Sequence, residues 1–290
     1  MAIQPSPAHL SHSQIAALLP SREGSCALRW GLKYRLGFQE APSLAMELGS
    51  ALDAGLNGML SSTLFGRGVD LQKGREELAA RLELIPDSLA DAEARKAEGK
   101  ALDQALLLFW ERHQDWQGQD VQFRFEVEWK GQQIVGVIDR VDADGTIVDH
   151  KLTRSQRAKD GVLDPEWVAE RQHQLALYLA CMALASGQPV GTWTKAALEV
   201  CYATARLKTP QWTVAELVIP QAEQEQALRD AETATFVRDS GRLPAHPGKW
   251  CAWCEFQVPC QAVQSVLAPR LEEVAEVVLP GVDGSPTEGA

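Results

Sequence analysis

The chain has 290 residues, of which 45% are hydrophobic and 23% are charged. This composition is ordinary for a soluble globular protein and supplies enough apolar surface for one large domain. The formal net charge of -11 argues against a general nucleic-acid coat protein, because such proteins need a basic surface that neutralises phosphates. No apolar run approaches the roughly 20 residues of a membrane-spanning helix, and no export signal stands at the start. We therefore expect a cytoplasmic protein without membrane contacts.

The first 120 residues are predicted to form a helical lobe. A short helix is expected after a Ser cap in "HLSHSQIAALL", and a second one over about 26–34. Over 45–114, apolar residues recur three and four positions apart, which is typical of helices that bury one face. Breaks in this pattern at Gly66, Gly68 and Pro86 divide the segment into several helices.

At Val121 the spacing of apolar residues changes to strict alternation, which predicts a strand over 121–129 with one buried face. Turn sequences at 130–133 and 142–145 separate this strand from two more, over 134–141 and 146–152. Three strands joined by such short turns predict an antiparallel meander.

A helix is expected next, with Asp164 as its cap, Pro165 at its first position and Gly187 just past its end. A strand over 195–202, a polar helix over 221–239 and a cysteine-rich end complete the pattern. Alternating helices and strands of this kind predict a mixed α/β fold. The acidic, Gly- and Pro-containing end over 270–290 is expected to be disordered.

Charged residues interrupt the apolar strands of the meander. Asp142 and Asp144 stand in a turn sequence and are interpreted as turn residues. Asp149 and Lys151 are two apart on one strand, so they point to the same face, and Asp139 lies on the neighbouring strand. A divalent cation such as Mg²⁺ or Mn²⁺ would relieve the cost of gathering these carboxylates. A structural ion-pair cluster is the alternative interpretation.

The stretches "GVIDRVD" and "IVDHK" resemble the core of the PD-(D/E)xK nucleases, in the branch of the RecB nuclease domain and the CRISPR-associated RecB-like exonucleases. Asp139, Asp149 and Lys151 match the two acidic positions and the lysine of that pattern. "QLALY" matches its Q-x-x-x-Y motif with Gln174 and Tyr178, which share one helix face.

The resemblance implies a restriction-endonuclease-like core, in which helices flank a mixed sheet containing the meander. It extends over most of the chain and implies one nuclease domain over 1–269. Within it, 1–120 would be the helical lobe, 121–205 the catalytic core, and 206–269 a helix and a cysteine-ligated cluster region.

The resemblance also implies roles for the site residues. Asp139 and Asp149 would bind Mg²⁺ or Mn²⁺ together with the backbone carbonyl of His150, and Lys151 would position the attacking water. Gln174 and Tyr178 would hold the lysine or the phosphate. The family's upstream metal-binding histidine is replaced here by Asp53 in "GSALD". A solvated helix aspartate is the alternative for Asp53.

Three cysteines near the end form a C-x2-C-x5-C run, which needs a fourth ligand to bind zinc or a 4Fe-4S cluster. His246 is close enough in sequence to complete a zinc site. Iron-sulfur members of the nuclease branch take the fourth ligand from an N-terminal helix, where this chain has Cys26. The resemblance therefore implies a 4Fe-4S cluster that is bound by Cys26, Cys251, Cys254 and Cys260. The remaining two cysteines, Cys181 and Cys201, are interpreted as small buried hydrophobic residues.

A basic stretch follows the third strand, and its side chains are candidates for contacts with the DNA backbone. The alternative is an ordinary solvated loop. The candidates are Arg154, Arg157 and Lys159.

The resulting prediction is a metal-dependent DNA exonuclease that acts in recombination, repair, or phage or CRISPR DNA processing. The sequence contains no G-x-x-x-x-G-K-[ST] motif, so unwinding would require a helicase, and an annealing or recombination protein is a further possible partner. Two rival classes are a non-catalytic DNA-binding or assembly module with the same fold and a structural zinc protein.

Overall fold

The computed structural model of the chain describes residues 5–19, 25–257 and 260. It divides into two compact units, a smaller one over 1–41, 128–134 and 229–290 and a larger one over 42–127 and 135–228. The acidic end predicted at 270–290 lies outside the described residues, and the single nuclease domain over 1–269 stays a prediction. None of the helices in the described part is long and apolar enough to span a membrane.

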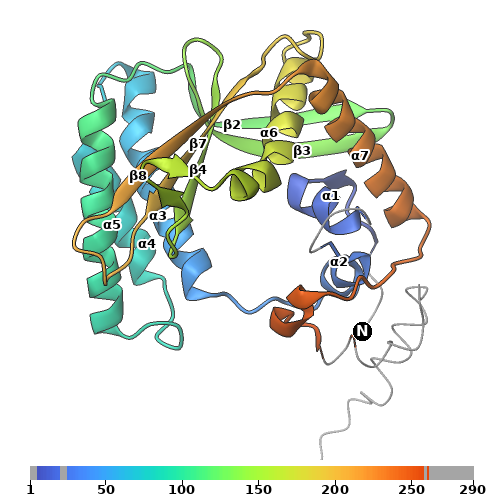
Figure 1. The fold of residues 1–290 in the computed structure, drawn as a ribbon, viewed down its shortest axis with the longest axis horizontal. Coiled ribbons are helices and arrows are strands. Elements are labelled where there is room, and N and C mark those ends of the chain that lie inside the picture. The colour runs from blue at the N-terminus through green and yellow to red at the C-terminus, as the bar shows by residue number, and fades with distance from the viewer. Residues whose placement is uncertain (1–4, 20–24, 258–259, 261–290) are drawn as a thin grey trace, which may run out of the picture. The chain divides into compact units, whose positions relative to one another are not determined.

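A mixed sheet organises the larger unit (Figure 1). Its order is β3-β4-β7-β8, and β2 pairs with β3. The pairing is antiparallel between β3 and β4, parallel between β4 and β7, and antiparallel between β7 and β8. The strands are β2 (Asp120–Trp129), β3 (Gln132–Val141), β4 (Ile147–Thr153), β7 (Lys195–Tyr202) and β8 (Gln211–Val218). The predicted mixed α/β fold and its three-stranded meander are confirmed, whereas β8 was not predicted.

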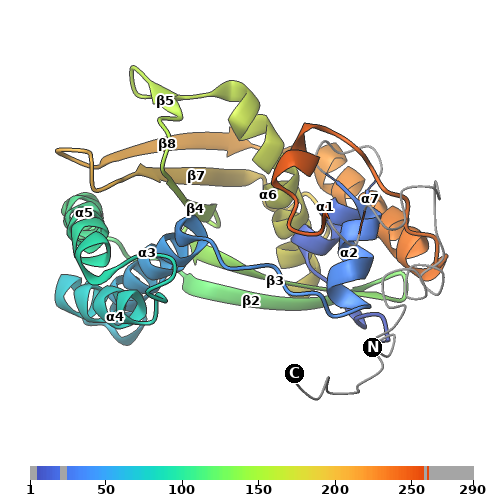
Figure 2. The ribbon, with the colours of Figure 1, turned by 90° about the horizontal axis from the view of Figure 1, so that it is seen from below.

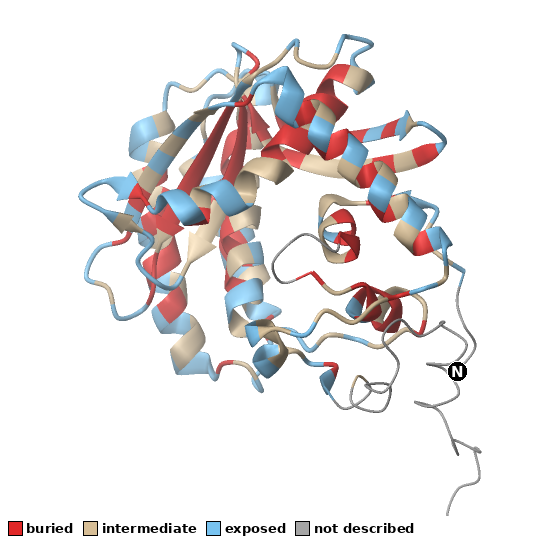
Figure 3. Ribbon diagram, turned by 45° about the vertical axis from the view of Figure 1, so that its right-hand side comes forward, coloured by how far each residue is buried: buried red, intermediate tan, exposed pale blue. Residues whose placement is uncertain are grey.

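Burial explains why β4 and β7 form the middle of this sheet. Figure 3 shows both strands mostly as buried, and all but the end residues of β7 are buried. Apolar residues such as Ile147, Val148 and Leu198 are at most 1% exposed. Strands that are covered on both faces need such continuous apolar runs. A charged residue inside them is therefore energetically unusual.

Three helices of the larger unit lie side by side next to the sheet (Figures 1 and 2). They are α3 (Leu44–Ser61), α4 (Leu71–Glu83) and α5 (Ala92–His113), and the short 3-10 helix η1 (Ser62–Phe65) follows α3. Ser43, Asp70 and Asp91 cap the N-termini, since each side chain accepts a hydrogen bond from a first-turn N–H. The predicted breaks between these helices are confirmed.

Glycine allows α3 and α4 to approach closely. A Cβ atom on Gly74 would lie 2.8 Å from the carbonyl oxygen of Gly55, which is closer than such atoms can pack. Around this contact the helices bury Leu52, Leu56 and Phe109, each at most 2% exposed. On its other side α3 contacts β4, so residues of α3 lie next to the sheet.

The long helix α6 (Pro165–Ala185) also contacts β4 and β7. Asp164 caps it by accepting from the Glu166 N–H at 3.0 Å, as predicted. A small hairpin of β5 (Ala158–Lys159) and β6 (Val162–Leu163) precedes it. Cys181 of α6 and Cys201 of β7 are both 0% exposed, which confirms the prediction that they are core residues.

The smaller unit joins segments from both ends of the chain. It contains β1 (His9–Leu10), α1 (His12–Leu18), α2 (Ala27–Tyr34), most of α7 (Gln221–Asp239) and the 3-10 helix η2 (Lys249–Trp253). β1 pairs in parallel with Gln133 and Ile134. The Leu28 N–H donates to the Pro244 carbonyl at 3.3 Å, and the rings of Phe38 and Phe256 lie 6.2 Å apart. The N-terminal helices thus pack against the C-terminal segment.

Candidate active site

Two adjacent strands carry the acidic residues of the candidate site. Asp139 lies on β3, and Asp149 and Lys151 lie on β4. Because alternate residues of a strand share a face, the side chains of Asp149 and Lys151 project together. Asp149 is only 4% exposed, so its charge needs a compensating group nearby.

The two oxygens of Asp149 have different surroundings. Oδ1 accepts hydrogen bonds from Lys151 Nζ at 2.8 Å and from Gln174 Nε2 at 3.2 Å. Oδ2 is buried and has no hydrogen-bond partner among the described residues. A buried carboxylate oxygen without a partner is costly, and a bound cation would remove that cost. The structure thus brings together three of the predicted site residues.

The second residue of the Q-x-x-x-Y pair packs beside this contact. The ring of Tyr178 meets that of Phe125 edge to face, with centroids 5.4 Å apart. Burial raises the pKa of Tyr178 to about 12, although the hydrogen bond to Gln174 acts in the opposite direction. Tyr178 therefore stays protonated, and its hydroxyl links to Asp149 through Gln174.

Asp139 is held by the main chain of β4. Its Oδ2 accepts a hydrogen bond from the His150 N–H at 2.8 Å. Burial raises the pKa of Asp139, and the negative charge of Asp53 raises it further, while the charges of His150 and Lys151 oppose the shift. Asp149 shows the same pattern: burial raises its pKa, and Asp139 adds to the effect. These mutual effects show that the carboxylates form one electrostatic cluster.

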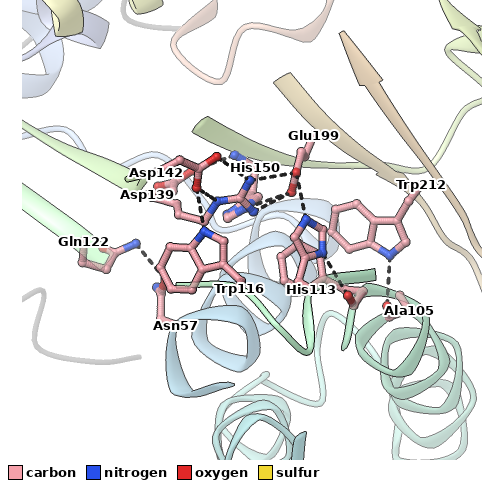
Figure 4. A network of polar contacts seen from close by, with 12 residues as sticks. Asn57, Ala105, His113, Trp116, Gln122, Asp139, Asp142, His150, Glu199 and Trp212 are labelled. Carbon is pink, nitrogen blue, oxygen red and sulfur yellow. Dashed lines mark hydrogen bonds and ion pairs between the residues drawn. The ribbon is translucent and has the colours of Figure 1, made fainter. Parts of the chain in front are cut away.

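Asp53 of α3 is half-buried, and the charges of this cluster act on its carboxylate. Burial raises its pKa, the charges of His150 and Lys151 lower it, and that of Asp149 raises it. Its Oδ2 accepts from Asn57 Nδ2 at 3.1 Å, and Asn57 Oδ1 accepts from Gln122 Nε2 at 3.0 Å, a contact drawn in Figure 4.

The sequence indicated neither Asn57 nor Gln122. Gln122 has a backbone φ of 57°, a left-handed conformation that costs a side-chain-bearing residue about 1 kcal/mol or more. The structure maintains this conformation where the side chain supports the partner of Asp53.

A second polar network lies around the same strands (Figure 4). Arg140 is 3% exposed, and its guanidinium binds both oxygens of Glu199 at 3.1 and 3.0 Å. Arg140 Nε also donates to Asp142 Oδ1 at 2.8 Å, and the same oxygen accepts from Trp116 Nε1 at 2.7 Å. Asp142 does stand in the predicted turn, since its N–H donates to the Thr146 carbonyl. It also holds a buried arginine, which the sequence did not indicate.

Two histidines complete the surroundings of Glu199. His113 Nε2 lies 3.3 Å from Glu199 Oε1, and its Nδ1 lies 2.9 Å from the Phe109 carbonyl. His150 Nε2 lies 3.3 Å from Glu199 Oε2 without the alignment of a hydrogen bond.

Burial alone would raise the pKa of Glu199, but the two histidines and Arg140 hold it well below its ordinary range. Glu199 is therefore charged and lies next to the side chain of His150, whose backbone N–H donates to Asp139.

The residues around Asp149 fit a divalent cation. In the part of the chain that the structure describes, no group of three or more His, Cys, Asp or Glu side chains has ready metal-binding geometry. However, Asp149 Oδ2 lacks a partner, and three carboxylates have raised pKa values because burial and each other's charge disfavour ionisation. Hard carboxylate oxygens are the ligands that Mg²⁺ and Mn²⁺ prefer.

A comparison with models of protein families agrees with these motifs. The model of the PD-(D/E)XK nuclease superfamily matches residues 9–261. The chain belongs to the PD-(D/E)XK nuclease superfamily.

Among solved structures, the chain is similar to a protein named "Putative exonuclease" from Eubacterium rectale, with 15% sequence identity and a TM-score of 0.52 over 80% of this chain and 82% of that one. At this identity the likeness concerns the fold. SSO0001 matches with 15% identity over 78% of this chain and 90% of its own, at a TM-score of 0.35, which is too low for an inference. No curated protein matches the chain.

The basic residues predicted to contact DNA differ in their surroundings in this nuclease-superfamily chain. Arg154 Nη2 donates to Glu98 Oε1 at 2.6 Å, so its charge is already paired within the protein. The side chains of Arg157 and Lys159 are exposed. Among the described residues neither forms an ion pair. Both are therefore available to an external anion.

The four cysteines of the predicted cluster belong to the smaller unit, three near η2 and one at the start of α2. Burial raises the pKa of the Cys260 thiol, and the charges of Cys26, Cys254 and Cys251 raise it further. The four sulfurs, all of them in the described part of the chain, do not have ready metal-binding geometry. The Sγ atom of Cys26 accepts from the Arg29 N–H at 3.5 Å, and that of Cys251 accepts from the Gly248 N–H at 3.4 Å. Such N–H groups stabilise thiolate ligands.

Proposed function

We propose that this member of the superfamily is a DNA exonuclease that depends on Mg²⁺ or Mn²⁺. The observation that carries the proposal is the asymmetric environment of Asp149. Lys151 and Gln174 bind one of its oxygens, while the other is buried without a partner among the described residues. This arrangement leaves one ligand position for a cation beside a lysine that can act on the substrate.

Each residue would have a distinct role in hydrolysis of a phosphodiester. Asp139, Asp149 and Asp53 would hold the cation, together with the backbone carbonyl of His150. When bound, the cation polarises the phosphodiester and offsets the charge that develops on it. Lys151 would then release Asp149 and hydrogen-bond the attacking water, whose orientation decides the rate. Gln174, supported by Tyr178, would keep Asp149 in place.

Digestion of labelled DNA tests the proposal. We expect Mn²⁺ or Mg²⁺ to start degradation of end-labelled linear DNA, a chelator to stop it, and covalently closed circular DNA to survive. The Lys151→Ala variant should lose activity by about a hundredfold or more, as removal of a group that acts on the transition state does. The matched control is Lys195→Ala. Lys195 also pairs with an aspartate, Asp144, but it is exposed and lies at the start of β7.

Each outcome of the digestion has a separate meaning. Cleavage of the circular substrate would assign endonuclease action and contradict the exonuclease proposal. No digestion by the parent protein with either metal, or equal activity in the two lysine variants, would contradict catalysis and favour the non-catalytic DNA-binding module.

We also propose the wider setting of the reaction. The resemblance to the RecB-like branch supports DNA recombination, repair, or phage or CRISPR DNA processing. Because the chain lacks a nucleotide-binding G-x-x-x-x-G-K-[ST] motif, a helicase, annealing protein or recombination protein would supply the other steps.

We further propose that Cys26, Cys251, Cys254 and Cys260 bind a 4Fe-4S cluster. The effect of the other three thiols on Cys260 and the N–H donors to two of the sulfurs support this ligand set. His246, the alternative zinc ligand, has its Nδ1 atom 3.3 Å from Ser25 Oγ. The cluster would join the N-terminal helix α2 to the C-terminal segment and would stabilise the smaller unit.

Metal analysis of the anaerobically purified protein tests the cluster. We expect about four iron atoms per chain and a broad visible absorption, both lost in Cys26→Ser and Cys254→Ser. The Cys181→Ala variant should keep its iron, because Cys181 is a buried core residue of α6. Zinc in place of iron, retained in Cys26→Ser and lost in His246→Ala, would instead assign a structural zinc site.

A further inference from the structure

Arg171 lies on the same face of α6 as the Q-x-x-x-Y pair. Arg171, Gln174 and Tyr178 are spaced three and four residues apart, so their side chains form one row on the helix. Gln174 contacts Asp149, and this face of α6 is therefore directed at the acidic site. Sequence motifs had not indicated Arg171.

The guanidinium of Arg171 is held in one position. Its central carbon lies 3.6 Å from the ring centroid of Trp167, and its Nη1 donates to the Trp167 carbonyl at 2.7 Å. Glu170 makes a further contact at 3.1 Å, but its side chain is 68% exposed. An exposed partner of this kind contributes little. Stacking on an aromatic ring leaves the edge of a guanidinium able to bind an anion.

A hollow continues the site along β4. Lys151 is in register with Val200 and Thr153 with Tyr202, so these four residues face the same side of the sheet as Asp149. Arg157 stands at this hollow, and none of the residues that line it is acidic. The residues that line the hollow include Thr153, Arg157, Val200, Tyr202, Gln211 and Thr213.

Arg157 lies beside the start of α6, because its carbonyl accepts a hydrogen bond from the N–H of the cap residue Asp164 at 2.8 Å. Burial lowers the pKa of Arg171, and the charge of Arg157 lowers it further, while the carboxylates of Glu170 and Asp149 raise it. Among the described residues Arg157 has no acidic partner. Two neighbouring guanidiniums without an anion between them are destabilising. A phosphate would convert this repulsion into charge-assisted hydrogen bonds.

We propose that Arg157 and Arg171 bind a backbone phosphate of the DNA strand next to the scissile one. This inference rests on the proposed nuclease function. It gives the substrate a direction across the site: from the acidic cluster, past Lys151, to Thr153 and Tyr202. Arg154 contributes nothing here, since Glu98 already neutralises it.

Binding without cleavage tests the subsite. The affinity for a fluorescent single-stranded oligonucleotide is measured by anisotropy in a chelator at several salt concentrations. We expect Arg171→Gln and Arg157→Gln each to weaken binding on the order of tenfold and to reduce the slope of log affinity against log salt by about one. Arg171→Lys should keep the slope but bind more weakly, because lysine cannot form the paired contact.

The matched control is Arg67→Gln, which removes the same charge from the exposed loop between η1 and α4. The subsite is overturned if Arg171→Gln and Arg157→Gln leave the salt slope unchanged. It is also overturned if they change the slope only as much as Arg67→Gln does. The exposed position of Arg157 keeps this test valid even if Arg171→Gln folds poorly. If the two arginine variants reduce the salt slope but the parent digests no DNA, only the nuclease proposal fails. If the parent digests DNA but the two variants leave the salt slope unchanged, only the subsite fails.

Discussion

Replacement of Asp149 by asparagine is expected to abolish DNA digestion and, at the same time, to stabilise the metal-free protein. The loss of activity should be at least about a hundredfold, because Asp149, the proposed ligand of the cation and the partner of Lys151, loses its charge. The gain in stability follows from removal of one charge from three mutually repelling, poorly hydrated carboxylates. We expect the free energy of unfolding to rise by roughly 1 kcal/mol, which corresponds to an increase of about 2–4 °C in the unfolding temperature.

The effect on stability should depend on pH in a defined direction. Asp53, Asp139 and Asp149 have pKa values above the ordinary value of 3.8 in the folded protein. The folded state therefore holds protons that the unfolded state has released, and stability falls as the pH rises from 3.8 through the raised values. The Asp149→Asn variant should lose less stability than the parent as the pH rises. A bound cation should do the same for the parent, since binding to the folded state alone is stabilising.

Thermal unfolding in a chelator and in Mn²⁺, over a pH series that begins near the ordinary carboxyl value of 3.8, measures these effects. Asp144→Asn is the matched control, because Asp144 lies in the same hairpin but is exposed and paired with Lys195. The bond to Lys195 holds the pKa of Asp144 below its ordinary range. This control should keep full activity and the Mn²⁺ response. If Mn²⁺ stabilises Asp149→Asn as much as the parent, Asp149 is not a ligand of the cation.

The sequence predicted the acidic residues of the site because they break a strong local pattern. Asp139, Asp149 and Lys151 interrupt apolar strands, and a charge in a buried strand needs a specific partner. Glu199 gives the same signal in "KAALEVCY" of β7, and reading it in the same way would have found the residue that binds Arg140. Both central strands, β4 and β7, thus mark their functional or structural charges by the same local signal.

Other parts of the site depend on contacts that no local pattern contains. Asn57 and Gln122 are 65 positions apart and meet only because α3 packs against the sheet. Arg154 was predicted to face DNA, whereas a glutamate 56 positions away pairs with it. The strand β8 was missed for a related reason. Of its residues only Trp212 is buried, while Val214 and Val218 are exposed, so its apolar residues do not mark one buried face.

Replacement of Glu199 by alanine is expected to destabilise the larger unit strongly. Arg140 would remain buried with only Asp142 as a partner, and breaking a buried ion pair on one side costs about 3 kcal/mol or more. The expected fall in unfolding temperature is roughly 6–12 °C. Because the folded pKa of Glu199 lies below its ordinary value of 4.5, its contribution is present above that pH and disappears as the pH falls. The difference between parent and variant should therefore shrink on acidification.

Urea unfolding of the parent, Glu199→Ala and a control, Glu216→Ala, distinguishes a buried network from a general effect of charge. Glu216 is exposed on the neighbouring strand β8, so its removal should change stability by at most about 0.5 kcal/mol. The double variant Arg140→Met with Glu199→Leu should recover most of the loss, because it leaves no unpaired charge inside. Equal stability of Glu199→Ala and Glu216→Ala would contradict the network. A loss of nuclease activity in the stable double variant would show that this network also supports Asp139, which accepts a hydrogen bond from the His150 N–H.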